Sequence, residues 1–361
     1  MDAVDPRPHW KRSQHESCPA FRLAGHAVLA RWLAVWLAAA AIPTPAQPFG
    51  LPTANRAIWQ DGGENRFFVG PAGRTWEGGL FGCVRTSGQQ LHEGIDIRCI
   101  QRDRQKEPVD PVLAAAAGTV AYVNRKSSLS NYGQYLILKH RIDDIEVYTL
   151  YAHLREIRSS LGPGDAIAQG EKIAVLGRTS NTSQGISRDL AHLHFEIGLL
   201  VNDRFPAWYK ANYPTQRNDH GVWNGQNLLG LDPRLVFLFQ RARGKAFHLR
   251  DFIQDQTALC RVLVRDPDFP FVRRYAPLIE PNQTAARLGV AGYEIALNYC
   301  GVPIRIIPRA ASEFASSAKY RLLSVNAAEQ SKNPCRRLVS RNGSRWVLTS
   351  AGTRLLDLLT Y

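Results

Sequence analysis

The stretch 91–99 carries two residues that could hold a metal ion, His92 and Asp96. In a β-strand side chains alternate between the two faces, so both residues would point the same way, with Gly94 between them. Gly94 adds no side chain and leaves room for an ion. Cys99 has the opposite parity, which argues against a metal role for its thiol.

The stretch 191–197 offers a third ligand by the same rule. His192, His194 and Glu196 alternate with apolar residues, so a strand here would turn the three polar side chains to one face. A catalytic zinc ion takes three protein ligands and keeps its fourth position for water or substrate. One of the two histidines would complete such a set with the pair in the first stretch.

A third alternating stretch, residues 147–154, is expected to send Tyr151 and His153 to one face. The three stretches together hold four histidines and one aspartate for three ligand positions. Two histidines are therefore left over. A hydrolase needs such groups to move protons and to stabilise an oxyanion.

The three motifs resemble those of the lysostaphin-type zinc metallopeptidases, also called LytM-type peptidoglycan endopeptidases. The resemblance rests on their order and spacing over residues 80–200, and the motifs read His92-x-x-x-Asp96, Tyr151-x-His153 and His192-Leu193-His194-Phe195-Glu196. It implies that one zinc ion is bound by His92, Asp96 and His194. The catalytic histidines would then be His153 and His192. The implied fold is mainly β, an antiparallel split barrel of the duplicated hybrid motif type.

The implied reaction is zinc-dependent hydrolysis of a peptide bond in bacterial peptidoglycan. Zinc lowers the pKa of its bound water from about 15.7 towards about 7 and polarises the scissile carbonyl. We favour His192 as the general base or proton shuttle and His153 as the donor to the oxyanion, and the reverse assignment stays open. The stem or crossbridge peptides of the wall are the expected partners, and the bond that is cut is not fixed by the sequence.

Two other function classes compete with this reading. A non-catalytic scaffold of the same fold could bind wall peptides or activate a partner amidase, but such proteins commonly lack ligands or catalytic histidines, and all five residues are present here. A carrier or phosphotransfer domain could use a pair of histidines without zinc. Asp96, four residues after His92, argues against that class, because phosphotransfer between histidines needs no third ligand.

The first part of the chain resembles a targeting segment. Basic residues precede an apolar run at residues 32–42, and small residues follow as far as Ala46, so residues 1–46 are expected to be a secretory signal peptide. An uncleaved anchor and a wrong start codon are the alternatives. We expect export to the periplasm or the cell wall, with no stable membrane span after cleavage.

Length and charge set further limits. A chain of 361 residues predicts two domains. The net charge of +14 would favour an anionic polymer such as the cell wall. The charge is spread without a long basic run, and we expect no nucleic-acid partner. The oligomeric state stays open.

Short β-branched and aromatic segments separated by Gly, Asn and Asp predict an antiparallel β domain at residues 47–235, with its core at 80–200. Residues 236–361 are expected to form a second, β-rich accessory domain of unknown role. Its predicted strands are 261–264, 292–297, 303–307, 320–325 and 345–349, with a terminal helix at 355–359.

The cysteines and several loop residues allow further expectations. Cys83 and Cys99 could pair in an oxidising compartment, whereas Cys260, Cys300 and Cys335 cannot all pair with one another. Each could equally be a buried free thiol. Residues 187–190 are expected to form an insertion relative to the family. Arg188 could meet a carboxylate of the stem peptide there, but a solvated loop arginine is the more common outcome. We expect a structural role for His140, a hairpin turn at Asp143-Asp144 and a surface loop position for His220.

Overall fold

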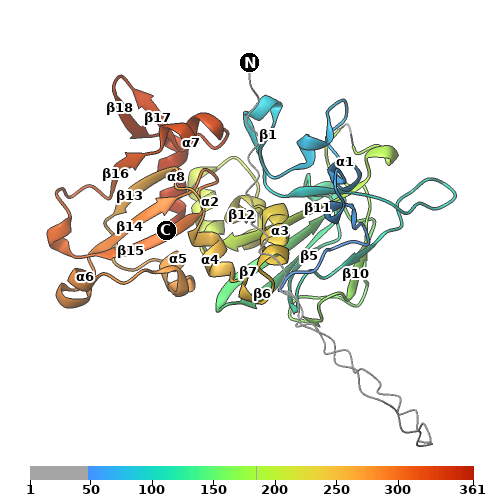
Figure 1. Ribbon diagram of the computed structural model, residues 1–361, viewed down its shortest axis with the longest axis horizontal. Coiled ribbons are helices and arrows are strands. Elements are labelled where there is room, and N and C mark those ends of the chain that lie inside the picture. The colour runs from blue at the N-terminus through green and yellow to red at the C-terminus, as the bar shows by residue number, and fades with distance from the viewer. Residues whose placement is uncertain (1–47, 184) are drawn as a thin grey trace, which may run out of the picture. The chain divides into compact units, whose positions relative to one another are not determined.

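The computed structural model describes residues 48–183 and 185–361 (Figure 1). The expected signal peptide, residues 1–46, lies outside this range and stays a prediction. Among the helices of the described residues, none has the length and apolar character needed to span a bilayer.

The largest sheet has seven strands and is antiparallel throughout (Figure 1). Its strands follow the order β12-β11-β7-β6-β5-β9, and β3 pairs with β11. Their bounds are β3 Ile95–Arg98, β5 Gly118–Asn124, β6 Tyr135–Ile142, β7 Ile145–Ala152, β9 Ala166–Ile167, β11 His192–Leu200 and β12 Leu228–Leu231. The prediction of an antiparallel β domain is therefore confirmed. The turn between β6 and β7 is the predicted hairpin, with positive φ at Asp143 and Asp144.

Strand β11 positions the candidate site because it pairs with two strands that carry motif residues. Leu193, Phe195 and Ile197 are fully buried on its core side, as their parity predicts. On the other side, His194 lies opposite Asp96 of β3 and opposite the last residue of β7. Backbone hydrogen bonds of one sheet thus bring the three motifs together.

Two smaller sheets flank the first. One pairs β1 (Gly82–Arg85) with β2 (Gln90–His92), and the other joins β4 (Pro111–Leu113), β10 (Lys172–Val175) and β8 (Glu156–Ile157).

The prediction of one continuous strand over residues 91–99 is wrong, because the chain leaves β2 at His92 and enters β3 only at Ile95. At the break, a Cβ on Gly94 would lie 2.4 Å from the Phe195 carbonyl oxygen, so only glycine fits there.

The C-terminal part contains a four-stranded antiparallel sheet and a hairpin. The sheet has the order β15-β14-β13-β16, with bounds β13 Cys260–Val264, β14 Gly292–Leu297, β15 Pro303–Arg309 and β16 Tyr320–Val325. The hairpin joins β17 (Val339–Asn342) to β18 (Arg345–Leu348). The β-rich character is confirmed, and the terminal helix α8 (Ser350–Leu359) begins five residues earlier than predicted.

Shorter helices connect these sheets. They are α1 Glu64–Phe67, α2 Phe205–Asn212, α3 Pro233–Arg243, α4 Leu249–Gln254, α5 Pro270–Arg274, α6 Gln283–Leu288 and α7 Ala327–Lys332. The sequence analysis did not predict α3, although Asp232 caps it and proline stands at its first position. Helix α3 spans residue 235, where we placed the domain boundary. Buried apolar residues on both sides form one continuous core, and the division into two domains stays a prediction.

Polar contacts also join the two parts. Arg274 of α5 forms an ion pair with Glu146 of β7, with Nε 2.9 Å from Oε1, and a second one with Asp203. The side-chain amide nitrogen of Asn202, Nδ2, donates to the Leu358 carbonyl at 2.8 Å, and both residues are buried.

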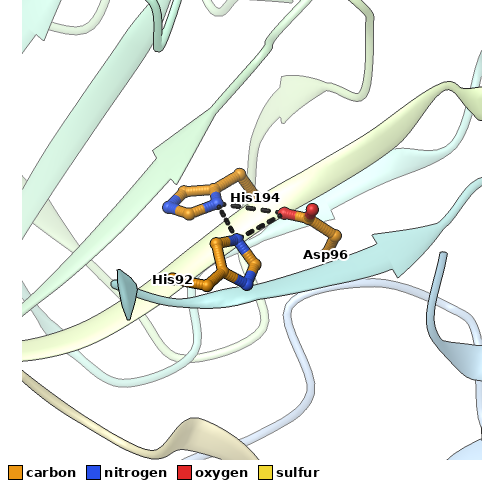
Figure 2. Close-up of side chains that lie close together, drawn as sticks. All are labelled: His92, Asp96 and His194. Carbon is orange, nitrogen blue, oxygen red and sulfur yellow. Dashed lines mark hydrogen bonds and ion pairs between the residues drawn. The ribbon is translucent and has the colours of Figure 1, made fainter. Parts of the chain in front are cut away.

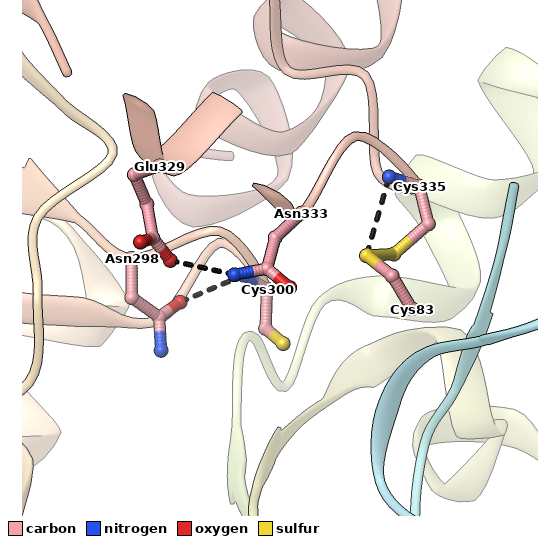
Figure 3. Close-up of a disulfide and its surroundings, with 6 residues drawn as sticks. All are labelled: Cys83, Asn298, Cys300, Glu329, Asn333 and Cys335. Carbon is pink, nitrogen blue, oxygen red and sulfur yellow. Dashed lines mark hydrogen bonds between the residues drawn. A yellow bond between two sulfur atoms is a disulfide. The ribbon is translucent and has the colours of Figure 1, made fainter. Parts of the chain in front are cut away.

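A disulfide links β1 to the C-terminal part, between Cys83 and Cys335 (Figure 3). The expected pairing of Cys83 with Cys99 is therefore wrong. Cys99 is buried, and its thiol donates to Asp110 at 2.9 Å. Cys260 and Cys300 are also buried free thiols. The sequence could not give the true pairing, because the two cysteines are 252 residues apart.

His140 has the structural role that we expected. Its ring is buried, with Nδ1 donating to the Ala117 carbonyl at 2.8 Å and Nε2 accepting from the Thr149 hydroxyl at 2.7 Å. Burial lowers the pKa of His140 to about 4. The folded protein therefore holds this ring neutral.

Breaking the disulfide should destabilise the folded chain. A cross-link that closes a long loop restricts the unfolded state, so replacing both Cys83 and Cys335 by serine should lower the free energy of unfolding by about 2 to 5 kcal/mol. Urea denaturation of the oxidised protein measures this. Adding reductant should reproduce the loss in the wild type and leave the double variant unchanged. A wild-type midpoint that does not respond to reductant would contradict the assigned pairing.

His140 should make stability depend on pH. Its folded pKa is lowered, so the unfolded chain takes up this proton first as the pH falls below about 6.5. The contribution of His140 to the free energy of unfolding is complete above pH 6.5 and is lost as the pH falls towards 4. Between pH 7 and pH 5 the wild type should lose about 2 kcal/mol more than the variant His140→Gln, measured by urea denaturation. Parallel pH profiles would show that His140 does not cause the effect.

Candidate metal centre

Three buried side chains from three strands meet at one point (Figure 2). His92 ends β2, Asp96 lies in β3 and His194 lies in β11. His92 Nε2 is 3.1 Å from His194 Nδ1, and Asp96 Oδ1 is 3.2 Å and 3.0 Å from these two nitrogens. Within the described residues, this is the one group of His, Cys, Asp and Glu with metal-binding geometry.

The spacing of these three atoms fits a tetrahedral zinc ion. Zn–N and Zn–O bonds of about 2.0 to 2.1 Å place neighbouring ligand atoms of a tetrahedron roughly 3.3 Å apart. The three separations here are 3.0 to 3.2 Å. Two imidazoles and one carboxylate are also a ligand set that zinc accepts, and a fourth position is left open.

Hydrogen bonds behind the cluster fix both imidazole rings. His92 Nδ1 donates to the Leu80 carbonyl at 2.7 Å, and His194 Nε2 donates to Glu196 Oε1 at 2.9 Å. A carbonyl or carboxylate oxygen accepts, so the proton of each neutral ring sits on the outer nitrogen. The inner nitrogens therefore present lone pairs, which is the usual arrangement of histidines that bind a metal.

The electrostatics of the cluster favour a positive charge at its centre. Burial opposes ionisation of Asp96, but the charges of His92 and His192 and hydrogen bonds from His194 and His92 hold its pKa well below the usual range. Burial also opposes a charge on His194, yet hydrogen bonds to Asp96 and Glu196 raise its pKa to about 10. The Arg85 guanidinium at Oδ2, together with an extra proton or a metal ion at Oδ1, compensates this buried carboxylate.

The two remaining histidines lie beside the cluster. The rings of His153 and His192 have centroids 4.9 Å apart, and His153 is 5.9 Å from His194. His153 Nδ1 donates to the Thr179 carbonyl at 2.8 Å, and His192 Nδ1 donates to the Leu190 carbonyl at 2.7 Å. In the neutral rings both Nε2 atoms are therefore proton acceptors. All five residues that the sequence singled out thus lie together.

One part of the sequence reasoning about His153 is wrong. Tyr151 and His153 do not share a face, because β7 ends at Ala152 and His153 has a φ of 60°. Tyr151 is fully buried in the core, where its hydroxyl accepts from the Ala115 amide at 2.8 Å. The left-handed backbone at residue 153 turns the histidine towards the other two rings instead.

Burial disfavours the charged form of both His153 and His192. It lowers the pKa of His153 to about 3, and the neighbouring His192 and His194 act in the same direction. Burial lowers the pKa of His192 as well, although the Asp96 carboxylate, 3.5 Å away, opposes this. Both side chains are therefore neutral near pH 7, and each Nε2 carries a lone pair.

Arg85 is a site residue that the sequence analysis missed. Its guanidinium contacts Asp96 Oδ2 and lies 3.1 Å from His92 Nε2. The arginine thus holds the outer oxygen of Asp96, while Oδ1 faces the two histidines. Arg85 lies outside the three motifs, and no residue pattern of the chain pointed to it.

Glu196 and Tyr132 form a second layer behind His194. Glu196 is buried and accepts both from His194 and from the Tyr132 hydroxyl, the latter at 2.6 Å. The alternation of β11 had placed Glu196 on the correct face without giving it a role. Tyr132 comes from a turn 64 residues before Glu196, and only the fold shows its contribution.

The cluster opens into a cleft of about 1370 Å³. His220 lines this cleft and is buried, with Nδ1 2.9 Å from the Tyr122 hydroxyl, so the expected surface position is wrong. Arg188 is an exposed loop arginine, which is the outcome that we favoured. It forms an ion pair with Glu107 at 2.6 Å and does not line the cleft.

Comparisons with known proteins give the following results. Residues 90–204 match the sequence profile of peptidase family M23. A zinc-containing peptidase from Vibrio cholerae is 27% identical over 30% of this chain and 26% of its own, with a TM-score of 0.22. A putative glycyl-glycine endopeptidase, LytM from Ruminococcus gnavus, is 26% identical over 30% of this chain and 39% of its own, with a TM-score of 0.23.

The catalytic domain of lysostaphin from Staphylococcus simulans is 16% identical over 48% of this chain and 88% of its own, with a TM-score of 0.27. This chain spans well under two thirds of the length of the first two structures. No curated protein sequence matches it significantly. The matched range contains the three strands that carry His92, Asp96 and His194. Residues 90–204 are therefore similar to peptidase family M23.

Proposed function

We propose that this protein is an exported, zinc-dependent endopeptidase that cleaves peptide bonds of bacterial peptidoglycan. The observation that carries the proposal is the convergence of the five residues. Three of them direct two lone pairs and a carboxylate oxygen at one point, and two more histidines present unprotonated Nε2 atoms beside it. Peptide hydrolysis needs both components, a cation site and groups that move protons.

In this proposal His92, Asp96 and His194 hold one zinc ion. When bound, the ion supplies Lewis acidity and makes a water molecule acidic enough to attack near neutral pH. Glu196 and the Leu80 carbonyl keep the two imidazoles in the tautomers that bind metal. The Nε2 lone pair of His92 cannot bind zinc and accept a hydrogen bond from Arg85 at the same time. In the zinc-bound protein Arg85 therefore loses its contact with His92 Nε2 and keeps its contact with Asp96 Oδ2.

We assign the general base to His192. Its Nε2 is unprotonated in the neutral ring and lies 3.5 Å from Asp96 Oδ1. The nearby carboxylate stabilises the imidazolium that forms when His192 takes the proton of the attacking water. The Leu190 carbonyl holds the ring in place while the charge develops.

The hydrogen bond of His153 restricts how it can act as a proton donor. Its Nδ1 proton is committed to the Thr179 carbonyl. His153 can therefore donate to a substrate oxyanion only when its Nε2 carries a proton. We propose that the two histidines act in sequence, His192 as proton acceptor and His153 as donor to the oxyanion.

Further observations support the proposed export and the proposed cell-wall substrate. Residues 1–46 have the composition expected of a signal peptide, and disulfides such as Cys83–Cys335 persist in oxidising compartments outside the cytoplasm. The profile match is to a family of peptidases. The complete set of ligands and catalytic histidines argues against the non-catalytic scaffold.

Digestion of purified peptidoglycan tests the proposal. The zinc-loaded protein should release soluble fragments with new free amines, identified by mass spectrometry, and a chelator should abolish their release. His192→Ala should lower the rate by at least about a hundredfold because the general base is lost. Asp96→Asn should lower both the rate and the zinc content.

The exposed hairpin variant Asp144→Asn is the matched control, since it removes a carboxylate far from the cluster. It should retain both the zinc content and the rate. If His192→Ala releases the same fragments at the wild-type rate, or if the loaded wild type releases none, the endopeptidase assignment is wrong.

A further inference from the structure

The C-terminal part of the chain contributes to the cleft that holds the metal-binding residues. Cys300 and Arg336 line this cleft together with His92, Asp96 and His194. Cys300 is a buried thiol, and burial raises its pKa to about 12, so it is unreactive. Arg336 is therefore the charged group that the C-terminal part adds to the cleft.

Four arginines line the cleft, and they differ in their partners. Arg85 contacts Asp96, and Arg217 forms an ion pair with Asp219 at 2.5 Å. Across the described parts of the chain, neither Arg74 nor Arg336 has a carboxylate within ion-pair distance. Arg74 is exposed to water, whereas Arg336 is half-buried.

Arg336 also has a buried donor without a partner. Its Nε is enclosed and makes no hydrogen bond. Seven other residues of the described chain have such a buried polar atom, but none of them lines the cleft. Because Nε is closed to solvent, a ligand in the cleft would meet the two Nη groups of Arg336, which have no carboxylate partner within the described residues.

The backbone holds Arg336 in place before any ligand arrives. The preceding residue, Cys335, is joined to Cys83 of β1 (Figure 3). The following residue closes a turn, with the Arg337 amide donating to the Pro334 carbonyl at 3.1 Å. The disulfide thereby ties Arg336 to the strand that also carries Arg85.

We propose that Arg336 determines substrate specificity by binding a free carboxylate of the peptide that occupies the cleft. The planar guanidinium presents paired N–H donors that match the two oxygens of a carboxylate. Glu77 and Glu93 also line the cleft and disfavour a carboxylate near themselves. The inference rests on the proposed function, and the substrate class that it names is a peptide with a free carboxylate distant from the scissile bond.

Matched substrates test this inference on the full, zinc-loaded chain. The probes are a soluble stem peptide ending in D-alanine, the same peptide with a C-terminal amide, and the same peptide with its D-glutamate carboxylate converted to a carboxamide. The wild type should prefer the acid over one of the two amides by about tenfold or more in kcat/KM, through KM. The amide that is disfavoured identifies which carboxylate Arg336 binds.

Arg336→Gln should reduce this preference to about one, and Arg336→Lys should restore part of it. The adjacent exposed residue provides the control, because Arg337→Gln should keep the wild-type preference. Zinc content and the urea midpoint show whether each variant is folded. If Arg336→Gln is folded and keeps the full preference, or if the wild type has none, the inference is wrong.

Calorimetric titration of the same three peptides separates this inference from the proposed function. If no peptide is hydrolysed, the endopeptidase proposal fails. A binding preference for the acid that Arg336→Gln removes would still support the role of Arg336. Equal binding of all three peptides, or binding of none, would overturn it.

Discussion

The site depends on the need to balance one buried negative charge. Asp96 is almost fully buried, and its Oδ1 faces two imidazole nitrogens at 3.0 and 3.2 Å. The outer nitrogens of His92 and His194 already donate to the protein, so in the neutral rings no proton remains for the inner ones. The Arg85 guanidinium contacts the outer oxygen Oδ2, and a carboxylate oxygen with two lone pairs at this separation favours a further cation at Oδ1. The proposed zinc ion would meet that requirement.

Strand pairing and carbonyl groups give this cluster its geometry. Strand β11 pairs with β3 on one side and β7 on the other, which sets Asp96 opposite His194 and brings the end of β7 close to both. Carbonyl oxygens of Leu80, Thr179 and Leu190 then select the tautomers of three histidines. The C-terminal part, tied to β1 by the Cys83–Cys335 disulfide, adds Arg336 to the same cleft.

Sequence reasoning selected five residues that the fold brings together, because strand parity and motif order can be read from short stretches of sequence. It correctly predicted the two faces of β11 and most strands of the C-terminal sheet. It was wrong where the backbone leaves the regular strand, at Gly94 and at His153, since parity holds only within an unbroken strand. It also missed Arg85 and the Cys83–Cys335 pair. Both depend on contacts between distant segments, which residue spacing does not encode.

X-ray absorption spectroscopy at the zinc edge tests the central claim most directly, because it observes the ligands without relying on activity. For the purified, zinc-loaded protein we expect three protein ligands at about 2.0 to 2.1 Å, two of them imidazoles, and no sulfur shell near 2.3 Å. Asp96→Asn should lose the bound metal. A sulfur ligand, or an imidazole count that is unchanged in a His194→Ala variant, would contradict the assignment of His92, Asp96 and His194 as the metal site.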